Sequence, residues 1–182
     1  MRGISRAFGI SRNTLSTWLK KKARQSPTIE ATLVAPQTDR EVLELDEMWS
    51  FVGKRRHKRW VWLALCQRTR QIVAFAIGRR DDLTCQRLWS AIPAPYRAVA
   101  QCLTDHWESY ANVLPRAQHR SVAKKQRLTN HIERFNNTVR QRLGRLTRKT
   151  LAFSKSEQMH ERVLRLFVIE YNRQRKVALN LN

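Results

Sequence analysis

The stretch that most constrains the fold runs from Glu41 to Gly53 and reads EVLELDEMWSFVG. Apolar and polar side chains alternate along it, which is the period of a β-strand whose two faces meet different surroundings. One face carries Leu43, Leu45, Trp49 and Phe51, and the other carries Glu44, Asp46, Met48 and Ser50. Two apolar runs of strand length follow, RWVWLALCQ and QIVAFAIG, so the simplest arrangement is three antiparallel strands.

Past the third strand, segments with a helical period alternate with short apolar runs. DDLTCQRLWSAI begins with acids and has apolar residues at helical spacing, which predicts a helix. The segments AVAQCLTDHW, HWESYANVL and HRSVAKKQ then predict a short strand, a helix and a last strand. Two amphipathic helices follow, in residues 130–148 and in SKSEQMHERVLRLFVIEYN. This order predicts an α/β domain over residues 41–175, an RNase H-like mixed sheet flanked by helices.

Residues 1–24 predict two helices of a helix-turn-helix. Gly9 and Ile10 form the turn, and Ser11 is a suitable N-cap for the second helix. The apolar residues that we expect to face inward are Ile4, Ala7, Phe8, Leu15, Trp18 and Leu19. Domains of this kind have a third supporting helix, so we expect the helix-turn-helix to be incomplete.

The outer face of the second N-terminal helix predicts contacts with DNA. Its polar side chains are Arg12, Asn13, Ser16, Thr17 and Lys20. Such side chains can reach base edges and phosphates in a major groove, although an ordinary basic helical hairpin would have the same composition. Residues 25–40 contain two prolines and no clear period, which indicates a linker to the domain that follows.

The net charge of the chain indicates a polyanionic partner. Its 36 Lys and Arg residues outnumber 14 Asp and Glu residues, for a formal charge of +22. Twelve Lys and Arg residues lie between Ser109 and Ser156, with Glu133 as the single acid. We expect double-stranded DNA as the partner. A homo-oligomer on DNA is a separate expectation, which does not follow from the charge. A membrane surface is the weaker alternative, because the basic residues are interleaved with Trp, Asn, Gln and Thr.

Composition also bounds the compartment and the cofactors. No signal peptide and no run of eighteen apolar residues is present, so we expect a cytoplasmic protein without a membrane association. The three cysteines are widely separated and form no C-x-x-C pair, which predicts neither a disulfide framework nor a zinc site. The five histidines also lack metal-ligand spacing.

Three carboxylates occupy special places in the predicted topology. Asp46 lies in the middle of the first strand, and Asp105 lies at the end of the fourth. Glu133 lies early in a helix, where Asn137 and Arg140 share its rim. Adjacent central strands of a mixed sheet would bring the two aspartates together beside that helix. The ordinary alternative for Glu133 is a surface residue paired with a neighbouring arginine.

These acids predict a metal site. A carboxylate on a largely apolar strand is costly to bury unless it is paired or coordinated. Three carboxylates together raise one another's pKa unless a cation neutralises them, and oxygen ligands favour Mg²⁺ or Mn²⁺. We therefore expect Asp46, Asp105 and Glu133 to be catalytic and to hold two divalent ions for phosphodiester displacement. Glu47 is a rival that the strand alternation places on the opposite face.

Three segments of the sequence resemble a known family. LDEMWSFVG, LTDHWESY and TNHIERFNNTVRQRLGRLTRKTLAFSKS are similar to the catalytic region of the insertion sequence 1 family of bacterial transposases, which are DDE recombinases. The similarity runs from about Leu45 to Tyr171. Carried over by position, the family's three acids fall on Asp46, Asp105 and Glu133. The resemblance implies a nucleoid-associated bacterial enzyme that cuts and joins the ends of its own mobile element, with a divalent metal.

The leading hypothesis is therefore a DDE transposase, with Arg12, Asn13, Thr17, Lys20, Asn137 and Arg140 in contact with DNA. Proteins of the resembled family begin with a zinc-binding module, and the present sequence lacks the cysteines for one. A truncated, non-catalytic DNA-binding repressor of transposition is accordingly a second hypothesis. An RNase H-like nuclease, which would hydrolyse strands without joining them, is a third.

Overall fold

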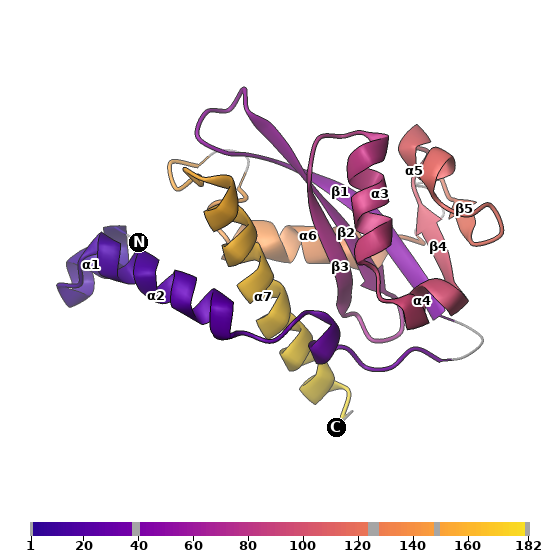
Figure 1. The fold of residues 1–182 in the computed structure, drawn as a ribbon, viewed down its shortest axis with the longest axis horizontal. Coiled ribbons are helices and arrows are strands. Elements are labelled where there is room, and N and C mark those ends of the chain that lie inside the picture. Colours follow the sequence, from indigo (N-terminus) through magenta and orange to yellow (C-terminus); the bar gives the residue numbers. More distant parts are fainter. Residues whose placement is uncertain (1, 38–40, 124–127, 148–149, 181–182) are drawn as a thin grey trace.

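The computed structural model describes residues 2–37, 41–123, 128–147 and 150–180. A five-stranded sheet in the order β3-β2-β1-β4-β5 forms its centre (Figure 1). The strands are β1 Glu41–Phe51, β2 Lys58–Cys66, β3 Ile72–Gly78, β4 Ala100–Thr104 and β5 His119–Ser121. The β1–β2 and β2–β3 pairs are antiparallel, and the β1–β4 and β4–β5 pairs are parallel. The mixed sheet confirms the predicted RNase H-like fold.

Helices cover both faces of the sheet. They are α3 Asp82–Ala91, α4 Ala94–Val99, α5 Glu108–Val113, α6 Asn130–Arg142 and α7 Glu157–Ala178. Leu43 and Leu45 share one core with residues of α3, α4 and α5, whereas Met48 shares the other with residues of α6 and α7. The alternation along β1 was therefore interpreted correctly, and Asp46 lies on the face that α6 covers.

Several boundaries differ from the predicted ones, among them the start of β4 and the end of α6. The run AVAQCLTDHW does not begin as a strand, because its first two residues complete α4. Pro95 in the first turn of α4 suits a helix start, since that position needs no N–H donor. Helix α6 ends at Arg142, several residues before the predicted end, yet Leu146 beyond it is still buried. The apolar stripe thus continues into the turn after the helix.

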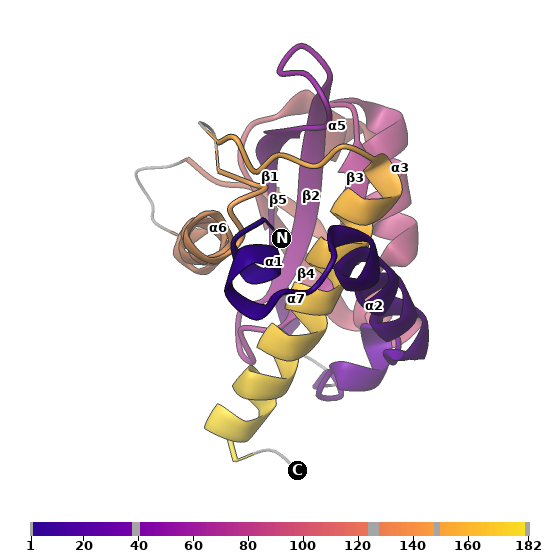
Figure 2. The same cartoon turned by 90° about the vertical axis from the view of Figure 1, so that its left-hand side faces the viewer.

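The N-terminal helices are α1 Arg2–Phe8 and α2 Arg12–Gln25. Gly9 has φ +63° between them, and Ser11 caps α2 by accepting the Thr14 N–H at 3.0 Å. Both helices and the cap were predicted, but the inward face was not predicted correctly. Trp18 is 54% exposed and Phe8 is 72% exposed, because α2 packs mainly against α7 (Figure 2). Leu15 is buried as expected.

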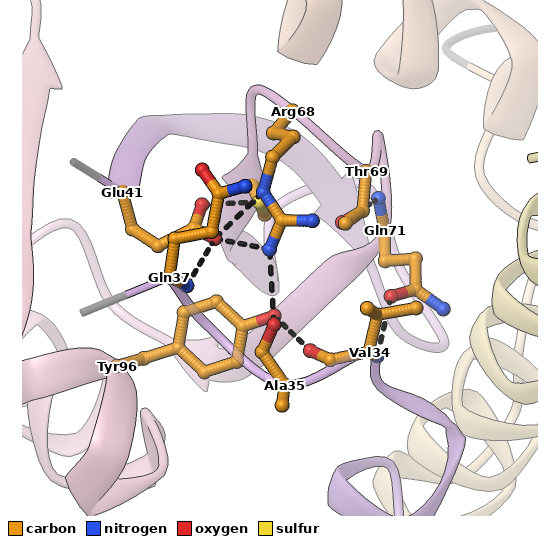
Figure 3. Close-up of polar contacts among 9 residues, drawn as sticks. Val34, Ala35, Gln37, Glu41, Arg68, Thr69, Gln71 and Tyr96 are labelled. Atoms are coloured by element: carbon orange, nitrogen blue, oxygen red, sulfur yellow. Dashed lines mark hydrogen bonds and ion pairs between the residues drawn. The ribbon is translucent and has the colours of Figure 1, made fainter. Parts of the chain in front are cut away.

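The segment that the sequence indicated as a linker is fastened to the sheet domain. It contains a 3₁₀ turn, Glu30–Thr32. Arg68 forms an ion pair with the buried Glu41 and donates a hydrogen bond to the Ala35 carbonyl at 3.0 Å (Figure 3). The Tyr96 hydroxyl donates to the Val34 carbonyl at 2.6 Å. These contacts hold the backbone of this segment close to Glu41, the first residue of β1.

None of the helices in the described ranges is long and apolar enough to cross a membrane.

Candidate active site

Strands β1 and β4 place the two predicted aspartates side by side. Their parallel register pairs Glu44 with Leu103, and continuing it by two residues sets Asp46 beside Asp105. Asp105 follows the last residue of β4 directly. Its Oδ1 accepts the backbone N–H of Trp107 at 3.0 Å, which fixes the carboxylate at the end of the strand. Both side chains are only partly buried, so solvent or a ligand can reach them.

The third predicted acid lies at the start of α6, and a buried acid of β1 holds that helix end in place. Glu44 Oε2 accepts the backbone N–H groups of His131 and Ile132, each at 2.9 Å. These donors belong to the helix terminus, where a negative charge is favourable. Glu133 follows at once and its side chain is exposed. Glu44 was not assigned a role from the sequence, although the alternation places it on the same face as Asp46.

Asp46 also contacts α6 directly. Asn136, which is 8% exposed, donates its Nδ2 to Asp46 Oδ2 at 2.7 Å. Burial, together with the negative charges of Glu47, Asp105 and Glu133, raises the pKa of Asp46 from 3.8 to about 7. The contributions of Asp105 and Glu133 mean that the three predicted acids share one electrostatic environment.

The other acids of β1 have donors within the protein that offset their charge. Glu41 is buried, but hydrogen bonds from Arg68 and from the Gln37 N–H hold its pKa below the usual value. Burial raises the pKa of Glu44 despite the N–H groups of α6 and a hydrogen bond from Gln67. Among the described residues, no basic side chain pairs with Asp46.

Glu47 points to the opposite face of the sheet, as predicted. It forms an ion pair with Arg80 and accepts the Tyr110 hydroxyl at 2.8 Å. The Arg80 guanidinium lies 3.7 Å from the ring centroid of Trp107 and 4.8 Å from that of Trp60. Burial raises the pKa of Glu47 in spite of these partners. Its charge therefore has a structural function on the α3 and α5 side.

The donor chemistry of the site fits a hard divalent cation, but its geometry is open. Asp46, Asp105 and Glu133 provide carboxylate oxygens of the kind that Mg²⁺ and Mn²⁺ prefer. Asn136 Oδ1 beside them is buried and finds no hydrogen-bond partner in the described part of the chain. Within the described parts of the chain, however, no three His, Cys, Asp or Glu side chains are arranged to hold one metal ion. Glu133 is exposed, whereas Asp46 and Asp105 are partly buried.

The residues predicted to bind DNA lie on two separate elements. Arg12, Asn13, Thr17 and Lys20 are exposed on α2, as expected for an outer face. Asn137 is exposed on α6, and Arg140 one turn later is half-buried. Their contacts with DNA stay predictions. The structure adds Asn136 to the residues of the candidate site. The sequence around Asn136 did not predict its hydrogen bond to Asp46 on β1.

Comparison with known proteins identifies the family. Residues 41–174 match the family model described as IS1 transposase. The chain belongs to the IS1 transposase family. It is 38% identical over 127 residues to the insertion element iso-IS1n protein InsB of Shigella dysenteriae, a match that covers 70% of this chain and 93% of that protein. It is also 38% identical over 149 residues to the IS1 9 protein InsB of Escherichia coli K12, which covers 81% of this chain and 84% of the relative.

Membership of the IS1 transposase family gives the protein a function related to transposition. An InsB protein of Haemophilus ducreyi matches with the same identity and coverage as that of Escherichia coli. The matched region begins at β1 and extends into α7, so it contains Asp46, Asp105 and Glu133. It leaves out α1, α2 and the segment fastened by Arg68.

Proposed function

We propose that this IS1-family protein is a DNA transposase that cleaves and joins strands at the ends of an insertion sequence by divalent-metal-assisted phosphodiester transfer. The observation that carries the proposal is that Asp46 has no ion-pair partner among the described residues. Glu41, Glu44 and Glu47 on the same strand all have donors within the protein, whereas Asp46 has the Asn136 amide and no cation among the described residues. A partly buried carboxylate in a chain of charge +22 is then available for a cation from solution.

In this proposal Asp46, Asp105 and Glu133 hold two Mg²⁺ or Mn²⁺ ions. Such ions, when bound, activate the attacking hydroxyl or water and stabilise the leaving oxygen. The protein's own part is to position the ligands. Asn136 orients Asp46, the Trp107 N–H orients Asp105, and Glu44 holds the first turn of α6 from which Glu133 projects. Glu133 thus lies, in sequence, between the two places where α6 is hydrogen-bonded to β1, at Glu44 and at Asp46.

We also propose where DNA lies. Arg12, Asn13, Thr17 and Lys20 on α2 would contact the ends of the element, and Asn137 and Arg140 on α6 would contact the strand beside the acids. A basic chain of this kind attracts duplex DNA through its phosphates, so binding should weaken with salt. Action as a homo-oligomer on DNA belongs to the same proposal.

The test is a strand cleavage and joining assay on element-end DNA with Mg²⁺ or Mn²⁺. Asp46→Ala and Glu133→Ala should each lower both steps by orders of magnitude, because metal binding supplies nucleophile activation and leaving-group stabilisation. Binding to DNA should persist. Glu108→Ala is the matched control, since Glu108 is an exposed acid three residues after Asp105. Glu47→Ala is unsuitable as a control, because it would leave Arg80 and the Tyr110 hydroxyl without their partner.

Three outcomes separate the hypotheses. Near-parent joining by folded Asp46→Ala and Glu133→Ala proteins would refute the proposed site. Cleavage without joining would favour an RNase H-like nuclease. A parent protein that binds the ends and never cuts them with any divalent ion would favour the non-catalytic repressor, a hypothesis supported by the open arrangement of the acids.

A further inference from the structure

A basic cavity lies on the flank of α6 opposite to Glu133. It has a volume of about 290 Å³, opens to solvent, and is lined by residues of β2, of the turn between β2 and β3, of α6 and of α7. Its polar walls are Arg70, His131, Arg134, Thr138, Tyr171 and Arg175. On α6, His131, Arg134 and Thr138 recur at helical spacing, and Glu133 and Asn136 point away from them. One helix therefore separates the acids from the arginines.

Among the described residues, acidic side chains offset the charge of this cavity only in part. No Asp or Glu lines it, and among the described residues none of its three arginines forms an ion pair. Arg175 Nε is buried and has no hydrogen-bond partner among the residues that the structure describes. A buried charged donor without a partner is costly, which indicates that a ligand supplies the acceptor. Glu44 is the nearby acid. Its carboxylate lies 3.9 Å from His131 Nε2 and interacts with the charge of Arg70, but the hydrogen bonds that it accepts come from the N–H groups of α6 and from Gln67.

Tyr171 forms the aromatic wall of the cavity. Its ring packs on Phe135 with the centroids 4.8 Å apart. Burial raises the pKa of Tyr171, and the nearby charges of four arginines, Arg175, Arg70, Arg142 and Arg134, only partly oppose this rise. The phenol therefore keeps its proton and can donate a hydrogen bond to an anion.

The backbone at Arg70 gives an independent observation. Arg70 has φ +60°, in the left-handed region that favours glycine or asparagine. Two backbone hydrogen bonds hold the turn in this form, from the Arg70 N–H to the Cys66 carbonyl at 2.8 Å and from the Cys66 N–H to the Gln71 carbonyl at 2.9 Å. The turn thus holds a residue other than glycine in a conformation that has a steric cost, and the side chain of that residue lines the same cavity as Arg175.

We propose that this cavity binds a phosphate group of the DNA. The guanidinium groups of Arg70, Arg134 and Arg175 and the Tyr171 hydroxyl supply the donors that phosphate oxygens require. An α-helix with its side chains is about 10 Å wide, which is the length of about three base pairs of duplex. A duplex lying across α6 would therefore place phosphates on both flanks at once. The inference rests on DNA as the partner in the proposed function, and it adds a second anchoring point outside the acidic site.

The first arm of the test is DNA binding by the full chain over a range of salt concentrations. Arg70→Gly and Arg175→Gln should each weaken binding about tenfold, as expected for one charge-assisted contact. Each should also lower the slope of log K against log salt by about 0.9. Arg173→Gln, an exposed neighbour on α7 with the same change in charge, should alter neither. Arg70→Gly should fold at least as stably as the parent, because glycine adopts φ +60° without strain.

The second arm uses inorganic phosphate in place of DNA, at constant ionic strength. Phosphate should raise the thermal midpoint of the parent and of Arg173→Gln, and should raise it less for Arg70→Gly and Arg175→Gln. A phosphate effect without any change in DNA binding would assign the cavity to a free phosphate compound, and would overturn the proposal. Parent-like behaviour of both variants in both arms would overturn it as well. Neither arm depends on cleavage, so a failure of the proposed catalysis is recognised separately.

Discussion

Replacing Asp46 with asparagine should stabilise the protein at neutral pH while abolishing its proposed chemistry. The folded state raises the pKa of Asp46 from 3.8 to about 7, chiefly through burial and secondly through Glu47. Below pH 3.8 this carboxyl is protonated in both the folded and the unfolded state, and it costs nothing. As the pH rises from about 4 to 7, the unfolded chain releases the proton that the folded chain still holds, and stability falls. Above pH 7 the full cost is present.

The size of the effect follows from the pKa. A rise of about three pKa units, at about 1.4 kcal/mol each, gives an upper limit of about 4 kcal/mol at pH 8. Because Asp46 is partly open to solvent, we expect about 2 to 4 kcal/mol. Asparagine retains an oxygen that can accept the Asn136 amide, so the Asp46→Asn variant loses the charge and keeps the contact. For a chain of this length the gain corresponds to roughly 5 to 15 °C in thermal midpoint.

The assay is urea unfolding of both proteins at pH 4, 6 and 8, followed by tryptophan fluorescence. The difference in unfolding free energy should be near zero at pH 4 and largest at pH 8. If the ion binds the ionised carboxylate as proposed, adding Mg²⁺ or Mn²⁺ at pH 8 should stabilise the parent and have little effect on Asp46→Asn. A variant no more stable than the parent at pH 8, or a difference independent of pH, would refute the argument from burial.

Two further predictions concern buried groups away from Asp46. Glu44→Ala leaves two N–H groups of α6 without acceptors and should cost about 2 to 4 kcal/mol, whereas Glu44→Gln should cost less; equal stability of both variants and the parent would refute its capping role. Burial, and secondly the charge of Arg145, lowers the pKa of His160 from 6.5 to about 4. The contribution of His160 to the free energy of unfolding is therefore fully present above pH 6.5 and should decline by up to about 3 kcal/mol as the pH falls to 4. Asp46 titrates over the same range with the opposite effect, so the test is the unfolding free energy of the parent minus that of His160→Gln, measured by urea unfolding. This difference should fall as the pH falls from 6.5 to 4, and a difference independent of pH would contradict the assignment.

The sequence was informative where periodicity reports local structure. The alternation along β1 predicted that Asp46 and Glu47 face opposite ways, and the two cores on either side of the sheet confirm it. The order of strands and helices predicted the mixed sheet. A period of two or 3.6 residues is a property of each segment alone, so it can be read before the partners of that segment are known.

The sequence was uninformative where a contact joins distant segments. Asn136 lies 90 positions from Asp46, and His131 lies 87 from Glu44, so no local pattern specifies either hydrogen bond. Trp18 was wrongly expected to face inward for a related reason. An apolar stripe on a helix predicts burial only if another element covers it, and within the described chain α2 has mainly α7 as a neighbour.

The arrangement around α6 explains why one strand carries so many acids. Glu44 holds the helix terminus to β1, and its charge is offset by the N–H groups that it accepts, so its negative charge is part of the fold. Two residues along the same face, Asp46 meets the same helix one turn further on, where the Asn136 amide is the one side-chain donor to it among the described residues. Asp46 cannot act as a helix cap at this position, because the backbone N–H groups inside a helix already donate to carbonyl groups of the same helix. The difference between the two positions therefore supports the proposal that Asp46, unlike Glu44, is a ligand for a cation from solution.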